Sequence, residues 1–401
     1  MRNRIKKFMI AGSAFLLCLG TGTSAFAEEI VDTANMDTYK IGVVVYSIQD
    51  EQVVAFREYL RDYIGVCFPD VEFIYSGAVN NEEEEMQFLQ DAADAGVKGI
   101  LSFSSYNLEE EVDFCAENEI YYIRAASSES DENFAKVEDN PYFLGCVGPG
   151  IEMEYEAGYD MGKYFTENKE TDEYFILSGG AAYGVEMHLQ RSEGILDAIE
   201  EAYSIDLGDK KEILSATEPV SVEEGGVKLC IVPGFLDSEL YSEAAKEAYQ
   251  EHPYKQVLSV IPISNLADTV ADASLGVIDC YSTENLILYT QGTLQYLTGK
   301  FSSTVAPSFA AMYNALTGYA EDFREDGKAF SLTQGFWTST DRQDYEEKYA
   351  LSCSIAMNAY SAEDIASVCK KLNPDATMGD LRGLSDAYTF EDAAARRGLQ
   401  D

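Results

Sequence analysis

The chain has 401 residues, of which 71 are Asp or Glu and 28 are Lys or Arg, so its formal net charge is −43. A chain this acidic repels nucleic acid and anionic lipid, and we expect neither as a partner. Its length exceeds that of one ordinary hydrophobic core and favours two lobes. The acidic residues are spread over predicted helices without the spacing of a calcium loop, so we expect no metal and no cofactor.

Residues 1–27 have the pattern of a secretory signal peptide. Four basic residues precede an apolar run that is too short for a good membrane span, and Ala25-Phe26-Ala27 supplies a cleavage site. We therefore expect an extracytoplasmic protein, periplasmic or secreted, with no direct membrane insertion after the signal is removed. A retained N-terminal anchor is the alternative.

From about residue 40 the sequence alternates predicted strands and helices. The first strand runs into a polar loop, and Asp50 is placed to cap a helix whose core face is formed by Val53, Phe56, Leu60 and Ile64. Further strands are expected at 71–77, 97–103 and 120–125. Strands separated by helices of this length form parallel βαβ units.

Gly148-Pro149-Gly150 interrupts this alternation and is a natural place for a hinge. The alternation then restarts with a helix at 151–166. Strands are expected at 174–180, 227–235, 256–264 and 275–282. The sequence therefore predicts two similar α/β lobes in tandem.

From Thr340 onward the last 60 residues have the pattern of helices. Four pairs have capping-box or near capping-box spacing: Thr340 and Gln343, Ser361 and Asp364, Thr377 and Asp380, and Thr389 and Asp392. Seven cysteines follow residue 27, an odd number without a C-x-x-C, so we expect buried thiols rather than a disulfide framework, with a Cys353–Cys369 bridge as the alternative.

The motifs of several enzyme classes are absent from the sequence. No G-x-G-x-x-G follows the first strand, and neither a Walker motif nor a G-x-S-x-G elbow occurs. The two histidines, His188 and His252, are far apart, and we interpret His188 as structural. We therefore expect a protein that is not an enzyme. A glycosidase that uses only carboxylates is the alternative.

Several segments between about 40 and 340 resemble, in order and spacing, the type 1 periplasmic binding proteins. These are the ribose- and galactose-binding group of ABC-transporter solute receptors. Arg191–Ile199 resembles the Arg-x-x-Gly-Phe helix of that family, and "GVIDCYS" resembles the strand that ends in a ligand-binding aspartate, here Asp279. The helix after the hinge carries a seam of small residues, here Ala157, Gly158 and Gly162.

The resemblance implies two Rossmann-like lobes with parallel sheets, joined by a three-crossover hinge and followed by a helical C-terminal appendage. We expect the N-terminal lobe at 40–147 and 301–328, the C-terminal lobe at 148–300 and 329–340, and the appendage at 341–401. Trp337 is expected in or beside the third crossover strand, or packed under the appendage.

The function implied is capture of a small polar ligand, a sugar or sugar derivative, in an interlobe cleft for an ABC importer. A ligand-sensing subunit for a membrane receptor kinase is the alternative, and a secreted carbohydrate-active enzyme is a third class. A neighbouring permease gene would favour transport over sensing.

The residues expected in the cleft lie at or near contact positions of the family, except Tyr183, which lies in a glycine-flanked loop. They are Tyr46, Gln49, Asp50, Arg124, Tyr183, Arg191, Asp279 and Lys300. Aspartates that accept hydroxyl hydrogen bonds, with arginines that donate in a fixed fork, suit a polyol or a sugar acid. Alternatively, Arg124 and Lys300 pair with local carboxylates. The first loop lacks the aromatic that the family often places there.

Overall fold

The computed structural model describes residues 38–236, 238–353 and 358–399, and the account below concerns these residues. The predicted signal peptide lies outside them. The described strands form two separate sheets, as the sequence predicts. Among the described residues, no helix is both long and apolar enough to cross a membrane.

The first sheet has six parallel strands in the order β12-β5-β4-β3-β1-β2. They are β1 (Tyr39–Val45), β2 (Val71–Ala78), β3 (Gly99–Ser102), β4 (Tyr121–Ala125), β5 (Phe143–Gly148) and β12 (Phe330–Thr333). Its helices are α1 (Glu51–Glu58), which continues through the π-helical turn η2 (Tyr59–Ile64) into α2 (Gly65–Cys67), then α3 (Glu82–Asp94), α4 (Leu108–Glu117) and α5 (Asp131–Val137).

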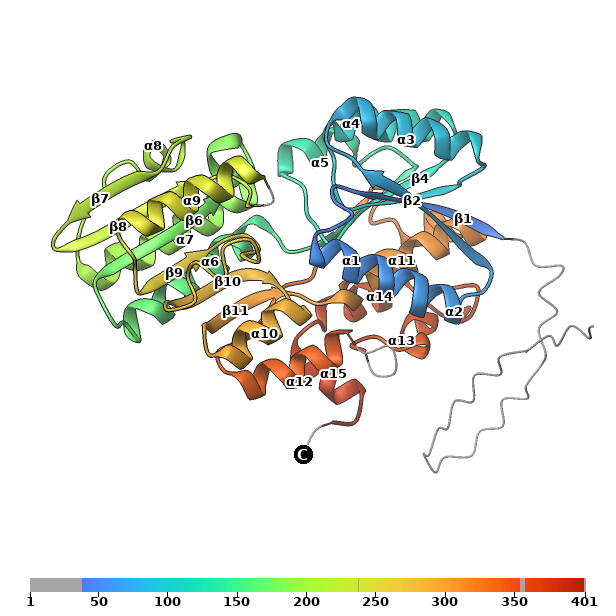
Figure 1. The fold of residues 1–401 in the computed structure, drawn as a ribbon. Coiled ribbons are helices and arrows are strands. Elements are labelled where there is room, and N and C mark those ends of the chain that lie inside the picture. The colour runs from blue at the N-terminus through green and yellow to red at the C-terminus, as the bar shows by residue number, and fades with distance from the viewer. Residues whose placement is uncertain (1–37, 237, 354–357, 400–401) are drawn as a thin grey trace, which may run out of the picture. The chain divides into compact units, whose positions relative to one another are not determined.

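The start of α1 forms as its sequence predicts. The Asp50 carboxylate accepts a hydrogen bond from the Val53 backbone N–H at 3.0 Å, which satisfies one of the free donors of the first turn. The predicted core face of Val53, Phe56, Leu60 and Ile64 is buried. Figure 1 shows α1 on one side of the sheet, with α3 and α4 on the other.

The second sheet has seven strands in the order β13-β11-β10-β9-β6-β8-β7, with antiparallel pairing only at its two edges. They are β6 (Glu173–Gly179), β7 (Val220–Glu224), β8 (Val227–Pro233), β9 (Gln256–Ser259), β10 (Ser274–Cys280), β11 (Leu294–Lys300) and β13 (Trp337–Ser339). Its helices are α6 (Ile151–Glu167), the 3-10 helix η3 (Gly180–Tyr183), α7 (Glu186–Tyr203), α8 (Lys210–Leu214), α9 (Glu239–Glu251) and α10 (Thr283–Gln291).

The chain passes between the sheets three times. It leaves the first sheet after β5, returns after β11 through η4 (Ser302–Val305) and α11 (Ala306–Asn314), and leaves again between β12 and β13. Helix α11 contacts β3, β4 and β5, and it continues into η5 (Ala315–Tyr319) and η6 (Ala320–Phe323). The three crossovers match the architecture that the sequence implies.

One boundary differs from the expectation. Residues 329–340 were assigned to the C-terminal lobe, but Phe330–Thr333 pair with β5 in the first sheet, and only β13 joins the second. The close approach of β12 to β5 requires a glycine, because a Cβ at Gly145 would lie 1.9 Å from the Phe330 carbonyl oxygen. The third crossover therefore begins after Thr333.

The C-terminal appendage is helical, as predicted. It contains α12 (Arg342–Cys353), α13 (Ala362–Ser367), α14 (Met378–Asp386) and α15 (Phe390–Arg396). Ser361 and Thr377 form complete capping boxes, and Thr389 caps α15. Thr340 does not cap α12. The Asp344 N–H donates to the Asp341 carboxylate at 3.0 Å, because the first helical residue is Arg342.

The appendage contacts elements of both sheets. Helix α14 packs on α11 and β12, whereas α12 packs on α10 and β13. Trp337 lies in β13, the third crossover strand, and also packs under the appendage. Both of the positions expected for it are therefore correct. Its Nε1 donates to the Tyr388 carbonyl oxygen at 2.7 Å, and its ring stacks on Phe301 with centroids 4.0 Å apart.

The described cysteine side chains are free thiols, and all are buried except the half-buried Cys67. This agrees with the expected absence of a disulfide framework for these residues. The side chain of Cys353 lies outside the described residues.

Helices α6 and α7 approach each other closely along the predicted seam of small residues. A Cβ at Gly158 would lie 1.9 Å from the Arg191 carbonyl oxygen, and a Cβ at Gly194 would lie 2.3 Å from the Tyr155 carbonyl oxygen. Backbone atoms cannot move aside as flexible side chains can. The two glycines therefore allow a helix contact that larger residues would prevent.

We expect Gly158→Ala to lower the free energy of unfolding by about 1–3 kcal/mol or more, because the added methyl group overpacks this contact. Gly383→Ala is the matched control. Gly383 lies in α14 with no atom near its missing Cβ, and alanine there should raise the free energy by up to about 1 kcal/mol. Urea unfolding followed by circular dichroism measures both. Equal stability of Gly158→Ala and wild type would contradict the close packing.

Candidate functional site

The carboxyl ends of parallel strands are where α/β sheets place their ligands, and most of the predicted contact residues lie there. Tyr46 follows β1, and its hydroxyl donates to the Asp50 carboxylate at 3.3 Å. Desolvation, together with the neighbouring Asp50, Cys280 and Asp279, raises the pKa of the Tyr46 hydroxyl. The loop after β1 in the first sheet thus faces the end of β10 in the second.

Asp279 lies near the end of β10 in an environment that disfavours its charge. Burial raises the pKa of its carboxyl group to about 7, and the charge of Asp50 acts in the same direction. The Asn285 side chain opposes this shift by donating to Asp279 Oδ2 at 2.7 Å. One carboxylate from each sheet therefore contributes to the same polar region.

Arg124, at the end of β4, is buried and held by local groups. Its Nε donates to Glu129 Oε1 at 2.6 Å, and its Nη1 donates to the Ser102 carbonyl oxygen at 3.2 Å. Arg124 therefore forms the local ion pair that was the alternative interpretation for this residue. The sequence analysis did not identify Glu129, although it lies only five residues further along the chain.

Arg191, in α7, is also buried and paired. Its Nε donates to Glu154 Oε2 at 2.6 Å, and its Nη1 donates to the Val260 carbonyl oxygen at 2.9 Å. Its guanidinium carbon lies 5.8 Å from the centre of the Phe336 ring in the third crossover. The sequence analysis missed Glu154, although its spacing from Ala157 and Gly158 places it on the buried face of α6.

Lys300 ends β11 and differs from both arginines. Burial lowers the pKa of its ammonium group to about 8, and the charges of Arg191 and Arg124 act in the same direction, whereas Glu154 and Asp50 oppose them. Among the described residues, no hydrogen bond or ion pair reaches its Nζ. Within this part of the chain, Lys300 therefore does not form the local ion pair that was its alternative interpretation.

His188 lies near Arg191 and Lys300, and nothing in the sequence indicated this neighbourhood. Burial, followed by the charges of Arg191 and Lys300, lowers the pKa of the imidazole to about 3. Its Nδ1 accepts a hydrogen bond from the Gly180 N–H at 2.9 Å, so the neutral ring carries its proton on Nε2. His188 is therefore a hydrogen-bond donor rather than a charge.

Two predicted contact residues stand apart from this region. Tyr183 is exposed, with its ring centre 5.6 Å from that of Tyr241, and within the described chain no contact joins it to the other predicted residues. Gln49 is exposed on the loop before α1, where it lines a neighbouring cavity. Their assignment as ligand contacts remains a prediction.

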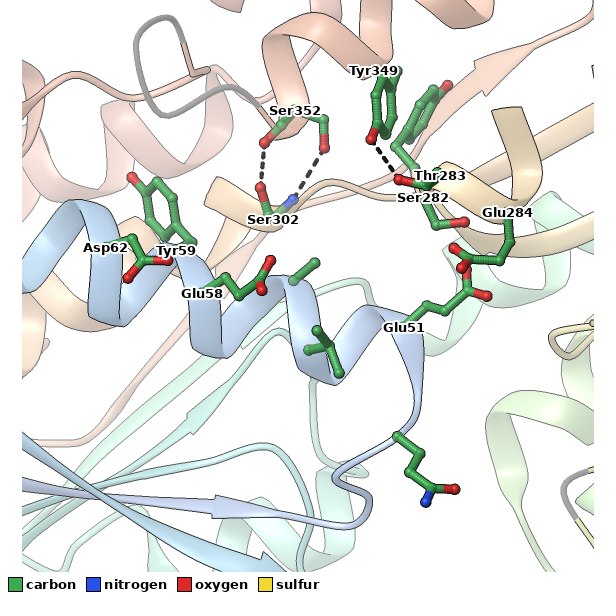
Figure 2. Close-up of a pocket in the computed structure, with 14 residues that line it drawn as sticks. Glu51, Glu58, Tyr59, Asp62, Ser282, Thr283, Glu284, Ser302, Tyr349 and Ser352 are labelled. Carbon is green, nitrogen blue, oxygen red and sulfur yellow. Dashed lines mark hydrogen bonds between the residues drawn. The ribbon is translucent and has the colours of Figure 1, made fainter. Parts of the chain in front are cut away.

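A cavity of about 420 Å³ lies between α1 and the turn from β10 to α10. Figure 2 shows its acidic lining, in which Glu51 from α1 faces Glu284 from α10. Burial raises the pKa of the Glu51 carboxyl group to about 8, and the charges of Asp279 and Glu284 contribute to this rise. The remaining acids of the lining, Glu58 and Asp62, make the cavity unsuitable for an anion.

Glu51 of this lining also belongs to a group of three side chains that could hold a metal ion. One ligand atom each from Glu51, Asp279 and Cys280 lies within 4.8 Å of the others. Two carboxylates with a thiolate would suit a divalent cation such as zinc. No metal was expected from the sequence. Glu51 lies in α1, more than 200 residues before Asp279 and Cys280 of β10, so the spacing in the chain gives no signal.

No protein-family model and no curated protein matches the chain. Solved structures do match. An ABC transporter solute-binding protein from Bacillus halodurans with bound myo-inositol has a TM-score of 0.57 at 16% identity, covering 79% of this chain and 99% of that one. A periplasmic solute-binding protein from Actinobacillus succinogenes with bound D-allose has a TM-score of 0.56 at 13% identity, covering 77% and 99%.

A third match, a putative LacI transcriptional regulator from Bacteroides fragilis, has a TM-score of 0.52 at 14% identity, covering 77% of this chain and 99% of that one. Identities this low show the fold alone. The chain therefore has the fold of the type 1 periplasmic binding proteins, as the sequence resemblance implies. A fold shared by receptors and regulators does not by itself define a function.

The raised pKa of Asp279 predicts a pH-dependent stability. Its folded-state pKa of about 7 lies above the ordinary value of about 3.9, so the folded protein binds the proton more tightly than the unfolded chain. Protonated Asp279 therefore favours the folded state. Its contribution to the free energy of unfolding is complete below about pH 4 and is lost as the pH rises through 7.

We therefore expect Asp279→Asn to have a higher melting temperature than wild type above pH 7, with a difference that shrinks toward pH 4. Differential scanning calorimetry across this range measures it. The control is Asp272→Asn, an exposed aspartate just before the opposite end of β10. A difference for Asp279→Asn that is constant with pH would contradict the assignment.

Proposed function

We propose that this protein is an exported solute-binding protein that captures a small polyhydroxylated ligand for an ABC importer, without catalysing its conversion. The observation that carries the proposal is the convergence of polar side chains from the two sheets. Asp50 and Arg124 come from the first sheet and act on the charges of Asp279 and Lys300 from the second. A ligand held there would contact both.

The chemistry of these groups suits a polyol. Carboxylates such as Asp50 and Asp279 accept hydrogen bonds from hydroxyl groups, while Arg124, Arg191 and Lys300 donate to oxygen atoms. Tyr46 presents a partly exposed ring beside them, although the first loop lacks the aromatic expected of the family. Two of the similar structures contain a polyol or a sugar, which supports this ligand class.

The three crossovers supply a mechanism for capture. In such a fold, rotation of one sheet and its helices against the other opens and closes the site, and a ligand that contacts both stabilises the closed form. An importer that recognises the closed form would then distinguish the loaded protein from the empty one. The signal peptide expected at 1–27 supports an extracytoplasmic location for this step.

A thermal-shift screen of neutral sugars, polyols and their derivatives tests the proposal. A ligand present at 100 times its dissociation constant adds about 2.7 kcal/mol to the free energy of unfolding, which is easily measured. The panel should include myo-inositol and D-allose. If no member of a broad panel raises the melting temperature, the proposed ligand class is wrong.

Asp279→Ala should weaken binding of the ligand found in this screen by about tenfold or more, because a charged hydrogen-bond partner is lost. Asp272→Ala should bind like wild type, since it removes an exposed aspartate near the other end of the same strand. Isothermal titration calorimetry measures both affinities. Equal affinities for the two variants would place the ligand elsewhere.

Arg191→Ala is a poor probe of binding in this structure. It would leave the buried Glu154 carboxylate without its partner, and breaking such a pair costs about 3–5 kcal/mol of stability. Weaker binding by this variant would therefore not distinguish a lost contact from a disturbed fold.

Closure should also change the emission of Trp337, the single tryptophan of the chain. The residue packs between Phe301 in the second crossover and Phe390 in the appendage, so movement at the hinge would alter its surroundings. We expect a shift in tryptophan fluorescence that saturates with the calorimetric affinity. An unchanged spectrum at saturating ligand would show that Trp337 is insensitive to binding and has a packing role alone.

A further inference from the structure

The three cations at the carboxyl ends of the strands differ in how their charges are balanced. Arg124 pairs with Glu129 and Arg191 pairs with Glu154, each at 2.6 Å. Lys300 is only 6% exposed as a residue, yet no hydrogen bond or ion pair to its Nζ occurs among the described residues. The Nζ atom is not among the fully buried atoms that lack a partner, so a group from outside the chain can reach it, and an acceptor there would stabilise the poorly hydrated ammonium.

The charges that act on Lys300 are two cations and two carboxylates, so they balance one another and leave the charge of Lys300 itself. The two cations are Arg191 of α7, the helix that also carries the neutral His188, and Arg124 of β4. The opposing charges are Glu154 and Asp50, but both are already engaged. Glu154 accepts from Arg191, and Asp50 accepts from the Val53 N–H and the Tyr46 hydroxyl.

We propose that the ligand of this cleft is an acidic polyol, whose carboxylate or phosphate group binds Lys300 Nζ beside the guanidinium group of Arg191. This inference rests on the proposed function and narrows its ligand class. The anionic end of the ligand avoids the carboxylates of Asp50 and Asp279, which repel it. Those carboxylates accept hydrogen bonds from the hydroxyl groups at the other end.

The preference for an acidic ligand depends on both the aspartates and Lys300. A neutral sugar would satisfy the aspartates but would leave Lys300 without an anion. Charge-assisted hydrogen bonds from an ammonium group to a carboxylate or phosphate are stronger than those to a hydroxyl oxygen. The cleft should therefore prefer an acidic polyol over its neutral counterpart.

Calorimetric titration of matched pairs tests this preference. D-galactose against D-galacturonate reports on a carboxylate, and D-glucose against D-glucose 6-phosphate reports on a phosphate. We expect at least one acidic compound to bind about tenfold or more tightly than its neutral partner. The pair that shows the preference identifies the anion.

Lys300→Met should remove the preference, with the acidic ligand losing about tenfold or more in affinity and the neutral sugar changing little. Its melting temperature without ligand should equal or exceed that of wild type, because an unpaired buried charge is removed. Lys300→Arg keeps the charge and should retain the preference. Lys255→Met, which alters an exposed lysine before β9, is the matched control and should bind as wild type does.

Failure of this inference differs from failure of the proposed function. Neutral sugars that bind as well as or better than their acids would overturn the acidic ligand while leaving sugar capture intact. An equal loss for both members of a pair in Lys300→Met would assign Lys300 a structural role and would also overturn it. No binding by any sugar or acid would instead contradict the proposed function itself.

Discussion

The contact between α6 and α7 is the constraint on which the arrangement of the proposed ligand site depends. Gly158 and Gly194 allow the two helix backbones to approach, and this approach brings Glu154 of α6 to the Arg191 side chain of α7. Because both side chains are buried, neither charge would be stable alone. The pair in turn fixes the guanidinium group beside Lys300 and the third crossover, where Phe336 lies against it.

The appendage adds a second constraint, because it contacts elements of both sheets. On the first sheet's side, Asn314 of α11 bonds to the backbone of Val368 and Lys370. On the second sheet's side, the Tyr345 hydroxyl bonds to the backbone carbonyl oxygen of Ser282. Any rotation between the sheets must therefore be accommodated by the hydrogen bonds and packing of these helices, as well as by the three crossovers.

The electrostatics of the proposed ligand site follow from its burial. Arg124 and Arg191 each have a carboxylate partner within the chain. Among the described residues, neither Asp279 nor Lys300 has an ion-pair partner, and burial raises the pKa of the Asp279 carboxyl group and lowers the pKa of the Lys300 ammonium group. These two groups, which come from adjacent strands of one sheet, are the ones whose charged forms the proposed ligand would stabilise.

The sequence by itself determined the local elements and, through their order, the fold class. Asp50, Ser361 and Thr377 cap the helices that their spacing predicts, because a cap involves only residues three or four positions apart. The place of Phe330–Thr333 depended on pairing with β5, which is distant in sequence. Likewise, only the tertiary structure decided that Arg191 has an ion-pair partner and that Lys300 has none among the described residues, because burial and ion pairing depend on residues that the fold brings together from different elements.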